Sequence, residues 1–346
     1  MSSGLKNVVV VGGSYVGMPR FAVLPKYEHK AFIPYTTTFA SSPHASQHAV
    51  IQARVSQLHK DHVVLDREWS NQGGSGSREI PFDYLVVATG TRLQPPGTMV
   101  HDDKPASVGY FQQYQTRVRD ARSIAIVGGG AVGVQMAADL KELYPDKEVT
   151  VVHSRAQLMP LYHEALDGII KERFADLGVK LVTGSRVVLP PGGFQDQDQE
   201  KGGPTTIKLQ NGTELTADLV IPAVGQTPNN QFLSSLPASS SLVNPANGFI
   251  RVRPTLQFRD PQYPHLFAVG DIADSGAHKA ARPGAAQAQV VAQNVLAMVE
   301  GREPSENIVV DPPAIHLTLG LTKNVIFKNP DTANGETEPK IIRKDE

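Results

Sequence analysis

Residues 124–133 read Ile124-Ala-Ile-Val-Gly128-Gly-Gly130-Ala-Val-Gly133, an apolar run that leads straight into a G-x-G-x-x-G turn. An amphipathic segment then continues to about Tyr144. In such a turn Gly128 permits the tight bend, Gly130 lets the backbone approach a pyrophosphate, and Gly133 allows close packing of helix on strand. A lone G-x-G-x-x-G is a weak signal, whereas one between a strand and a helix is much stronger. The stretch therefore predicts a dinucleotide-binding turn, with phosphates at the helix N-terminus.

The chain after this turn keeps alternating between strands and helices. We expect a strand at 148–153, a helix at about 163–177 that ends at Gly178, and a strand at 179–182. Residues 218–225 read as one more buried strand closing on glycine. This βαβ order predicts an α/β fold whose parallel sheet is joined by right-handed crossovers.

The end of the second strand bears on which nicotinamide dinucleotide is preferred. An NAD-binding unit carries an acid about 20 residues beyond the turn, where it accepts hydrogen bonds from the ribose hydroxyls. This chain has His153-Ser154-Arg155 there. Arg155 can pair with a 2′-phosphate and Ser154 can bond to either ribose form, so the pattern favours NADPH or tolerance of both. An Arg155 that merely points to water is an equal alternative.

A second glycine-rich turn, Gly12-Gly13-Ser14-Tyr-Val-Gly17, follows the valines at 8–11. Its middle glycine is replaced by Ser14, and Met18-Pro19-Arg20 stands where a helix should begin. Four prolines between 19 and 43 predict an extended or looped chain. The helix that would hold phosphate and the acid that would hold ribose are both missing.

Three other segments read as strands that end in short polar or glycine turns. Residues 50–66 alternate in the manner of strands, residues 81–88 lead into Ala88-Thr89-Gly90, and residues 266–269 lead into Gly270-Asp271. Ligands of parallel sheets bind at the carboxyl ends of the strands. Asp271 is therefore placed to accept hydrogen bonds from a sugar-alcohol chain, the alternative being an ordinary turn-forming aspartate.

Composition excludes several classes of protein. The 346 residues suffice for two domains, and 40% hydrophobic with 19% charged residues describes a globular chain. A net charge of -1 gives no support to nucleic-acid binding. There is no cysteine, which removes disulfides, thiolate zinc sites and the redox-active cysteine pair of many flavoenzymes. No metal site is predicted.

Targeting signals are not visible in the sequence. No cationic stretch with an apolar run opens the chain, position 2 is Ser, and the apolar runs are of strand length. We expect no transmembrane segment and a cytoplasmic protein, with peripheral attachment to a mitochondrion or lipid droplet as a family-level alternative.

The ordered set of turns, with Val224-Gly225-x-x-Pro228 among them, resembles the two-dinucleotide FAD/NAD(P)H oxidoreductases of the pyridine nucleotide-disulfide oxidoreductase fold. Short stretches of the sequence are similar to the apoptosis-inducing-factor-like branch, which includes the ferroptosis-suppressor quinone reductases. The similar strings are Lys30–Tyr35 (KAFIPY), Tyr144–Ser154 (YPDKEVTVVHS) and Gly270–Asp274 (GDIAD). The resemblance covers nearly all of residues 5–327.

This resemblance implies which residues hold the cofactors. The first turn and Asp271 would hold FAD, with the Ala88–Gly90 segment near its pyrophosphate and adenine side, and the turn at 128–133 would hold NAD(P)H. The predicted cofactor-binding residues are Gly12, Gly13, Ser14, Gly17, Ala88, Thr89, Gly90, Gly128, Gly130, Gly133, Ser154, Arg155, Gly225, Gly270 and Asp271.

The resemblance also implies residues near the reacting groups. Family members place a lysine just before the last helix, which Lys279 matches; it would stabilise negative charge on the reduced flavin, unless it is purely structural. Quinone-reducing relatives border their quinone with glutamines at i and i+4, a spacing shared by Gln289 and Gln293. A polar face turned to solvent or to a subunit is an equal alternative for these glutamines.

The chain departs from the family pattern in two places. Relatives carry some tens of residues between the counterparts of Gly17 and Pro19, holding the first helix and the second strand, and they continue past the counterpart of Glu346. The apolar stretch 314–327 is expected to be followed by a polar, frayed end.

We predict two Rossmann-like, three-layer domains, the first of them incomplete. FAD would lie on residues 1–118 and 245–300, NAD(P)H on 119–244, and a shortened segment would follow at 301–346. The predicted reaction passes electrons from NAD(P)H through FAD to a quinone-like acceptor. The alternatives are a flavin-free, inactive NAD(P)H-binding or interaction protein and an oxygen-reducing flavin oxidase.

Overall fold

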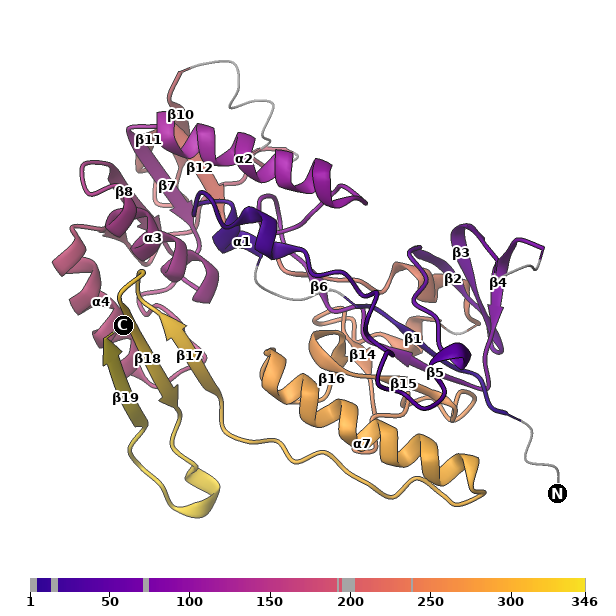
Figure 1. Cartoon of the computed structure of the whole chain (residues 1–346). Helices are drawn as coiled ribbons and strands as arrows, with labels where there is room; N and C mark the ends of the chain where they lie inside the picture. The colour runs from indigo at the N-terminus through magenta and orange to yellow at the C-terminus, as the bar shows by residue number, and fades with distance from the viewer. Residues whose placement is uncertain are drawn as a thin grey trace. The chain divides into compact units, whose positions relative to one another are not determined.

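The computed structural model describes residues 5–13, 18–70, 75–191, 193–194, 203–237 and 239–345, and the chain divides into two compact units. Unit 1 comprises Met1–Val16, Pro34–Arg92 and Thr227–Val310. Unit 2 comprises Gly17–Ile33, Leu93–Gln226 and Asp311–Glu346. Each unit contains its own parallel sheet (Figure 1).

The parallel sheet of unit 2 has four strands in the order β12-β7-β8-β9. Every neighbouring pair is parallel, and Val127 at the end of β7 lies in register with both Val152 and Pro222. These strands are short and rich in β-branched residues, as expected of strands that are buried on both faces. Their bounds are β7 Ser123–Val127, β8 Glu148–Val152, β9 Lys180–Val182 and β12 Leu219–Pro222.

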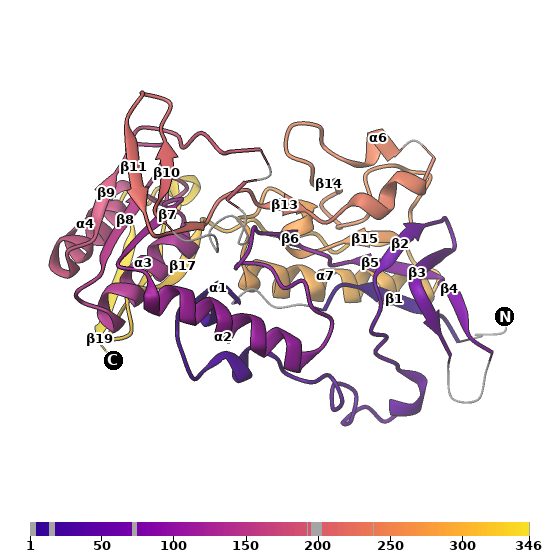
Figure 2. The same cartoon turned by 90° about the horizontal axis from the view of Figure 1, so that it is seen from above.

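Three helices cover one face of this sheet and a hairpin covers the other (Figure 2). The helices are α2 (Lys104–Asp120), α3 (Ala131–Leu143) and α4 (Glu164–Leu177), and the hairpin is β10 (Thr205–Lys208) with β11 (Glu214–Ala217). Helix α4 ends where the sequence predicts, because Gly178 takes a left-handed φ of 71° that closes the last turn. Helix α2 had no counterpart among the predicted elements; its N-terminus is capped by the Asp103 side chain, which accepts from the Ala106 N–H at 2.8 Å.

The segment after the second glycine turn belongs to unit 2. Instead of the extended or looped chain expected between residues 19 and 43, its described residues up to Ile33 form helix α1 (Met18–Phe21) and a single helical turn at Glu28–Ala31. A further helical turn at Ala45–Gln47 belongs to unit 1. Arg20 anchors α1 to α3, since its Nε and Nη2 donate to the two carboxylate oxygens of Asp139 at 2.8 and 3.0 Å. Asp139 is fully buried, and burial raises its pKa to about 6 although the Arg20 charge opposes the shift.

The C-terminal part of unit 2 is an antiparallel sheet of β17 (Ala314–Thr318), β18 (Lys323–Lys328) and β19 (Lys340–Asp345). The expectation of a frayed end was wrong, because residues 340–345 pair with all six residues of β18. Leu317 and Phe327 are fully buried in the core that also contains α3 and α4. The sheet is therefore part of the core of unit 2.

The parallel sheet of unit 1 has the order β1-β5-β15, with β1 at Val8–Val11, β5 at Tyr84–Val87 and β15 at Leu266–Ala268. Helix α7 (Ala281–Val299) packs on the face that Tyr84 and Val86 share. The shorter elements of unit 1 are β2 Val55–Leu58, β3 His62–Trp69, β4 Ser77–Pro81, β6 Thr91–Arg92, β13 Thr227–Pro228, a helical turn at Gln231–Ser235, α6 Ser239–Leu242, β14 Ile250–Arg251, a turn at Gly270–Ile272 and β16 Ala273–Asp274. No helix in the described ranges is long and apolar enough to cross a membrane.

Strand β1 is incompletely covered. Val8 and Val10 pair with Tyr84 and Val86 and so point to the α7 side of the sheet, yet they are 48% and 60% exposed. Val86 on the neighbouring strand is only 8% exposed. No strand in the described part of the chain pairs with the outer edge of β1. The uncovered face and edge lie beside the place where the family resemblance leads us to expect a further helix and strand.

Candidate functional site

The carboxyl edge of the unit 2 sheet gathers the predicted nicotinamide-nucleotide residues. Because β7, β8 and β9 are parallel and in register at Val127, Val152 and Val182, the loops that follow them leave the sheet side by side. The turn at 128–133 follows β7, the Ser154–Arg155 pair follows β8, and Gly225 follows β12 with a φ of 81°.

The glycines of the 128–133 turn fall into two kinds. A Cβ on Gly128, whose φ is 125°, would lie 2.5 Å from the Ala223 carbonyl oxygen, and one on Gly133 would lie 1.9 Å from the Gly128 carbonyl oxygen. A Cβ on Gly130 would meet no heavy atom within 4 Å. Gly128 and Gly133 are thus required by internal packing, whereas Gly130 leaves space in front of the N-terminus of α3, where a pyrophosphate would lie.

His153 connects the second strand to this turn. Its Nδ1 accepts from the Gly129 N–H at 3.1 Å, so in the neutral ring the proton is on Nε2. Burial lowers the pKa of His153, and the positive charge of Arg155 acts in the same direction. The neutral form of the ring is therefore favoured at the position where an acid binds ribose in NAD-dependent units.

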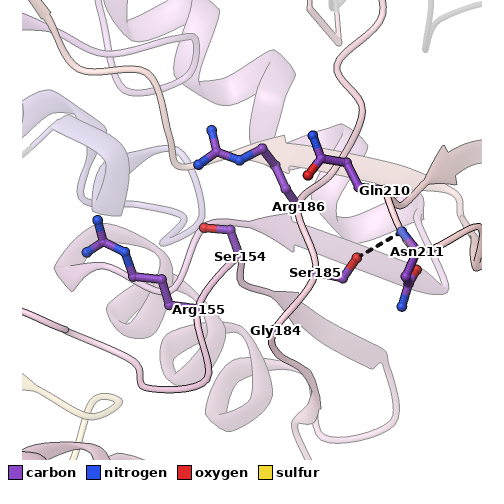
Figure 3. A pocket seen from close by; sticks show the side chains of 7 residues that line it. All are labelled: Ser154, Arg155, Gly184, Ser185, Arg186, Gln210 and Asn211. Atoms are coloured by element: carbon purple, nitrogen blue, oxygen red, sulfur yellow. Dashed lines mark hydrogen bonds between the residues drawn. The ribbon is translucent and has the colours of Figure 1, made fainter.

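Beyond His153 lies an open pocket of about 470 Å³ at the ends of β8 and β9 (Figure 3). It brings the predicted residues Ser154 and Arg155 together with Arg186, which sequence reasoning missed. The signal for Arg186 was available, because it stands just after the third strand of a predicted parallel sheet. The lining residues are Ser154, Arg155, Gly184, Ser185, Arg186, Gln210 and Asn211.

The carboxyl edge of the unit 1 sheet gathers the residues predicted for FAD. Gly12 follows β1 with a φ of 115°, and a Cβ there would lie 2.3 Å from the Ala88 carbonyl oxygen at the end of β5. Gly13 lies beside the Tyr35 hydroxyl, which a Cβ would approach to 3.4 Å. The other two residues of this predicted turn, Ser14 and Gly17, lie outside the described residues.

The Ala88–Gly90 segment is held by a neighbouring loop of the same unit. The Thr89 hydroxyl donates to the Asn229 carbonyl at 2.7 Å, and the Asn229 amide donates to the Thr89 carbonyl at 2.9 Å. The Asn229 N–H donates to the Gly90 carbonyl at 3.1 Å. Asn229 is thus a positioning residue that sequence reasoning missed.

Gly270, Asp271 and Lys279 lie together after β15. The Gly270 N–H donates to Gln287 Oε1 at 2.7 Å, which fixes the turn against α7. Burial raises the pKa of Asp271 and lowers that of Lys279, and each group's charge opposes the shift of the other. The Lys279 ammonium donates to the Ala273 carbonyl and lies 4.2 Å from the centre of the Phe249 ring.

The glutamines of α7 differ in exposure. Gln287 is buried, whereas Gln289 and Gln293 are exposed on the same helix. A role for Gln289 and Gln293 beside an acceptor stays a prediction.

The two edges differ in how well they fit a dinucleotide. The edge of unit 2 has the space at Gly130, a 13-residue helix behind it, and polar side chains at the ribose end. The edge of unit 1 has the close approach at Gly12 and the carboxylate of Asp271, which suit a pyrophosphate and a sugar-alcohol chain. On its β1 side, the described residues supply neither a second strand nor a long helix.

Residues 39–294 match the family described as pyridine nucleotide-disulphide oxidoreductase. Fe-regulated protein 8 of Mycosarcoma maydis is 35% identical over 322 residues, which cover 89% of this chain and 77% of that protein. FAD-dependent oxidoreductase FVFD30 of Flammulina velutipes is 33% identical, with 87% of this chain and 86% of that protein covered.

A more distant relative, ferroptosis suppressor protein 1 of Mus musculus, is 28% identical over 362 residues, with 94% of this chain and 88% of that protein covered. This alignment is longer than the 346-residue chain, so the relative contains residues that have no counterpart here.

Solved structures support the fold. The sulfide:quinone oxidoreductase of Aquifex aeolicus superposes with a TM-score of 0.66 at 15% identity, covering 98% of this chain and 87% of that chain. This likeness concerns the fold, and with the two parallel sheets it confirms the predicted α/β class with Rossmann-like domains.

Proposed function

The chain belongs to the pyridine nucleotide-disulphide oxidoreductase family, and we propose that it passes two electrons from NAD(P)H through FAD to a quinone-like acceptor. The family membership confirms the resemblance drawn from the sequence and the assignment to NAD(P)H-dependent oxidoreductases. Enzymes of this family are FAD-dependent and take their electrons from NAD(P)H.

One observation carries the proposal: each unit has a parallel sheet whose carboxyl edge ends in a tight glycine turn. In unit 2 the turn is at Gly128, and in unit 1 it is at Gly12, with left-handed φ values of 125° and 115°. In each case a neighbouring strand ends so close to the turn that a Cβ would collide with its carbonyl oxygen. Two such edges in one chain suit two dinucleotides, a donor and a flavin.

The chain's own residues bind and orient the donor at unit 2. Gly130 admits the pyrophosphate, and the N-terminus of α3 presents N–H groups that no side chain caps. His153 accepts a hydrogen bond from the glycine turn, and its lowered pKa favours the neutral ring, which adds no charge beside the ribose.

The residues proposed for FAD lie on unit 1. Bound flavin supplies the hydride and electron-transfer chemistry, and no side chain need act as acid or base in that step. Asp271 would hold the sugar-alcohol chain, and Lys279 would place a half-buried positive charge nearby. The Ala273 carbonyl and the Phe249 ring hold that ammonium in position.

A quinone-like acceptor is proposed on two grounds. The chain has no cysteine, so its electrons do not leave through a protein dithiol. The sequence resembles the branch that contains quinone reductases. Gln289 and Gln293 are exposed on one helix, four residues apart, the spacing that the resemblance assigns to the acceptor side.

One structural observation favours the alternative of a flavin-free protein. The exposed valines of β1 and its unpaired edge, in the part of the chain that the structure describes, lie where a helix and a strand would support the adenosine half of FAD. A chain without that support would bind the nicotinamide nucleotide but not retain the flavin.

The visible absorption spectrum of the purified chain, recorded with and without added FAD, tests the proposal. We expect flavin bands that survive desalting and bleach when NADPH or NADH is added without oxygen. A colourless protein that FAD does not reconstitute would support the flavin-free alternative instead.

Acceptor specificity then separates a quinone reductase from an oxygen-reducing oxidase. We expect NAD(P)H consumption to rise by at least about 10-fold when a soluble quinone is added, with little hydrogen peroxide formed. Peroxide formed in a one-to-one ratio with NAD(P)H, and no increase with quinone, would identify an oxidase.

A further inference from the structure

The pocket at the ends of β8 and β9 carries an inference about the nicotinamide nucleotide. It is built from three loops of unit 2: one after β8, one after β9, and the turn between β10 and β11. The Gly184 N–H donates to the Arg155 carbonyl at 3.1 Å, and the Gln210 N–H donates to the Arg186 carbonyl at 2.9 Å. These backbone bonds tie the three loops together, so their side chains are held around one space.

The chemistry of this pocket is that of an anion site. Two guanidinium groups, from Arg155 and Arg186, line it together with hydroxyl and amide side chains, and the described lining residues include no carboxylate. Within the described residues, neither guanidinium forms an ion pair. In the view of Figure 3 the Arg155 guanidinium lies to the left of the Ser154 hydroxyl and the Arg186 guanidinium lies above it. Planar guanidinium groups suit the bidentate recognition of phosphate.

The position of the pocket indicates which phosphate of a dinucleotide it would bind. A dinucleotide with its pyrophosphate at Gly130 extends its adenosine ribose across the end of the neighbouring strand, which here is β8. The ribose 2′ position then faces the residues after Val152, where an acid would select the free hydroxyl and an arginine would accept a 2′-phosphate. Among the described residues that line the pocket, the charged side chains are both arginines.

We propose that Arg155 and Arg186 form a 2′-phosphate site that makes the chain selective for NADPH over NADH, with Arg186 as the second cation. This inference rests on nucleotide binding at unit 2 as part of the proposed function. It does not depend on flavin, because it concerns the adenosine end of the donor. Arg186 comes from a different loop than Arg155, so the site exists only when β8 and β9 are paired.

The experiment measures binding of 2′,5′-ADP, 5′-AMP and inorganic phosphate to the full chain by titration calorimetry. The proteins are the wild type, Arg155→Gln, Arg186→Gln and Arg343→Gln. Arg343 is the matched control: it lies in the same unit, is exposed, and pairs with Glu172 at 3.1 Å away from this pocket. Thermal unfolding of each variant verifies that folding is retained.

We expect the wild type to bind 2′,5′-ADP about 100-fold more tightly than 5′-AMP, and inorganic phosphate more weakly than either. Arg155→Gln and Arg186→Gln should each weaken 2′,5′-ADP about 10-fold without changing 5′-AMP, and Arg343→Gln should change neither.

Equal affinity of the wild type for 2′,5′-ADP and 5′-AMP would overturn the inference, while the binding of both would still support a nucleotide site on unit 2. Inorganic phosphate that binds as tightly as 2′,5′-ADP would also overturn it, because the pocket would then be a general anion site. Selectivity for 2′,5′-ADP in a protein that never retains flavin would uphold the inference and reject the proposed electron transfer.

Discussion

At the scale of single residues, two glycines of one turn are expected to have different roles, one in stability and one in nucleotide binding. Gly128→Ala places a Cβ 2.5 Å from the Ala223 carbonyl oxygen at a φ of 125°, so we expect a loss of about 3 kcal/mol or more in the free energy of unfolding. Gly130→Ala meets no protein atom within 4 Å and should leave that free energy within about 1 kcal/mol of wild type. Its Cβ should nevertheless weaken 5′-AMP and NADPH binding at least about 10-fold.

Chemical denaturation and calorimetric titration of the two glycine variants check this division. A Gly130→Ala protein that binds the nucleotide normally would contradict the placement of the pyrophosphate in front of α3.

Arg20 and Asp139 give a prediction that depends on pH. The folded pKa of Asp139, about 6, lies above its unfolded value of 3.8, so the free energy of unfolding falls as pH rises from about 4 to about 6. Arg20→Met removes the ion-pair partner that this carboxylate has among the described residues and should raise the folded pKa further. We expect Arg20→Met to lower the free energy of unfolding by about 3 kcal/mol at about pH 8. This difference should become smaller toward about pH 5, where Asp139 is protonated.

Urea denaturation of Arg20→Met and wild type across this pH range measures the effect. The double variant Arg20→Met/Asp139→Asn is the control, since it has no carboxylate to titrate and should lose the pH dependence. If Arg20→Met lowers the free energy of unfolding equally at both ends of this pH range, the packing of α1, and not the buried charge, is responsible.

At the scale of elements, the incomplete cover of β1 predicts unequal effects of one substitution on two adjacent strands. Val10 and Val86 are paired, are the same residue and face the same side of the sheet, but they are 60% and 8% exposed. Val86→Ala should cost about 2 kcal/mol, because it removes buried methyl groups and leaves a cavity. Val10→Ala should cost less than about 1 kcal/mol.

Denaturation of the apoprotein compares the two valine variants directly. An equal loss for Val10→Ala and Val86→Ala would mean that β1 is covered in solution, and the explanation for missing support of FAD would then fail.

The elements that the sequence predicted are those whose sequence pattern lies within the element or directly beside it. Strand β7, the glycine turn and α3 are adjacent in the chain, and Gly178 alone ends α4. Helix α2 was missed because it has little amphipathic pattern and buries the polar Gln115, which donates to the carbonyls of Phe21 and Leu24. The ordered β19 was missed for a similar reason, since its six residues are all exposed and it is paired along its whole length with β18.

The residues of the candidate site also divide into those with a local sequence signal and those without one. The glycines and Asp271 belong to local motifs, so the sequence alone is sufficient to predict them as candidates. Arg186 and Asn229 act through loops that only the tertiary structure brings to their partners: Arg186 enters the pocket from the β9 loop, and Asn229 bonds to Thr89 across 140 residues. The sequence predicts in general which strand ends lie side by side. It does not predict which side chain of one loop contacts a neighbouring loop.

At the scale of the whole molecule, each unit is assembled from three separated stretches of chain. The core of unit 2 combines α3 and α4 with Leu317, Val325 and Phe327, which lie more than a hundred residues later in the sequence. Neither unit is therefore a contiguous piece that can be excised, and a deletion that removes residues 311–345 would expose apolar surface of α3 and α4.

The late position of β17 and β18 has a consequence for synthesis on the ribosome. The βαβ part of unit 2 is complete once Pro222 has been made, but the strands that finish its core are translated later. At about 5–20 residues per second this leaves an interval on the order of 5–20 seconds. During that time the nascent chain exposes the apolar surface of α3 and α4 to solvent, where a chaperone or another nascent chain can contact it before β17 and β18 do.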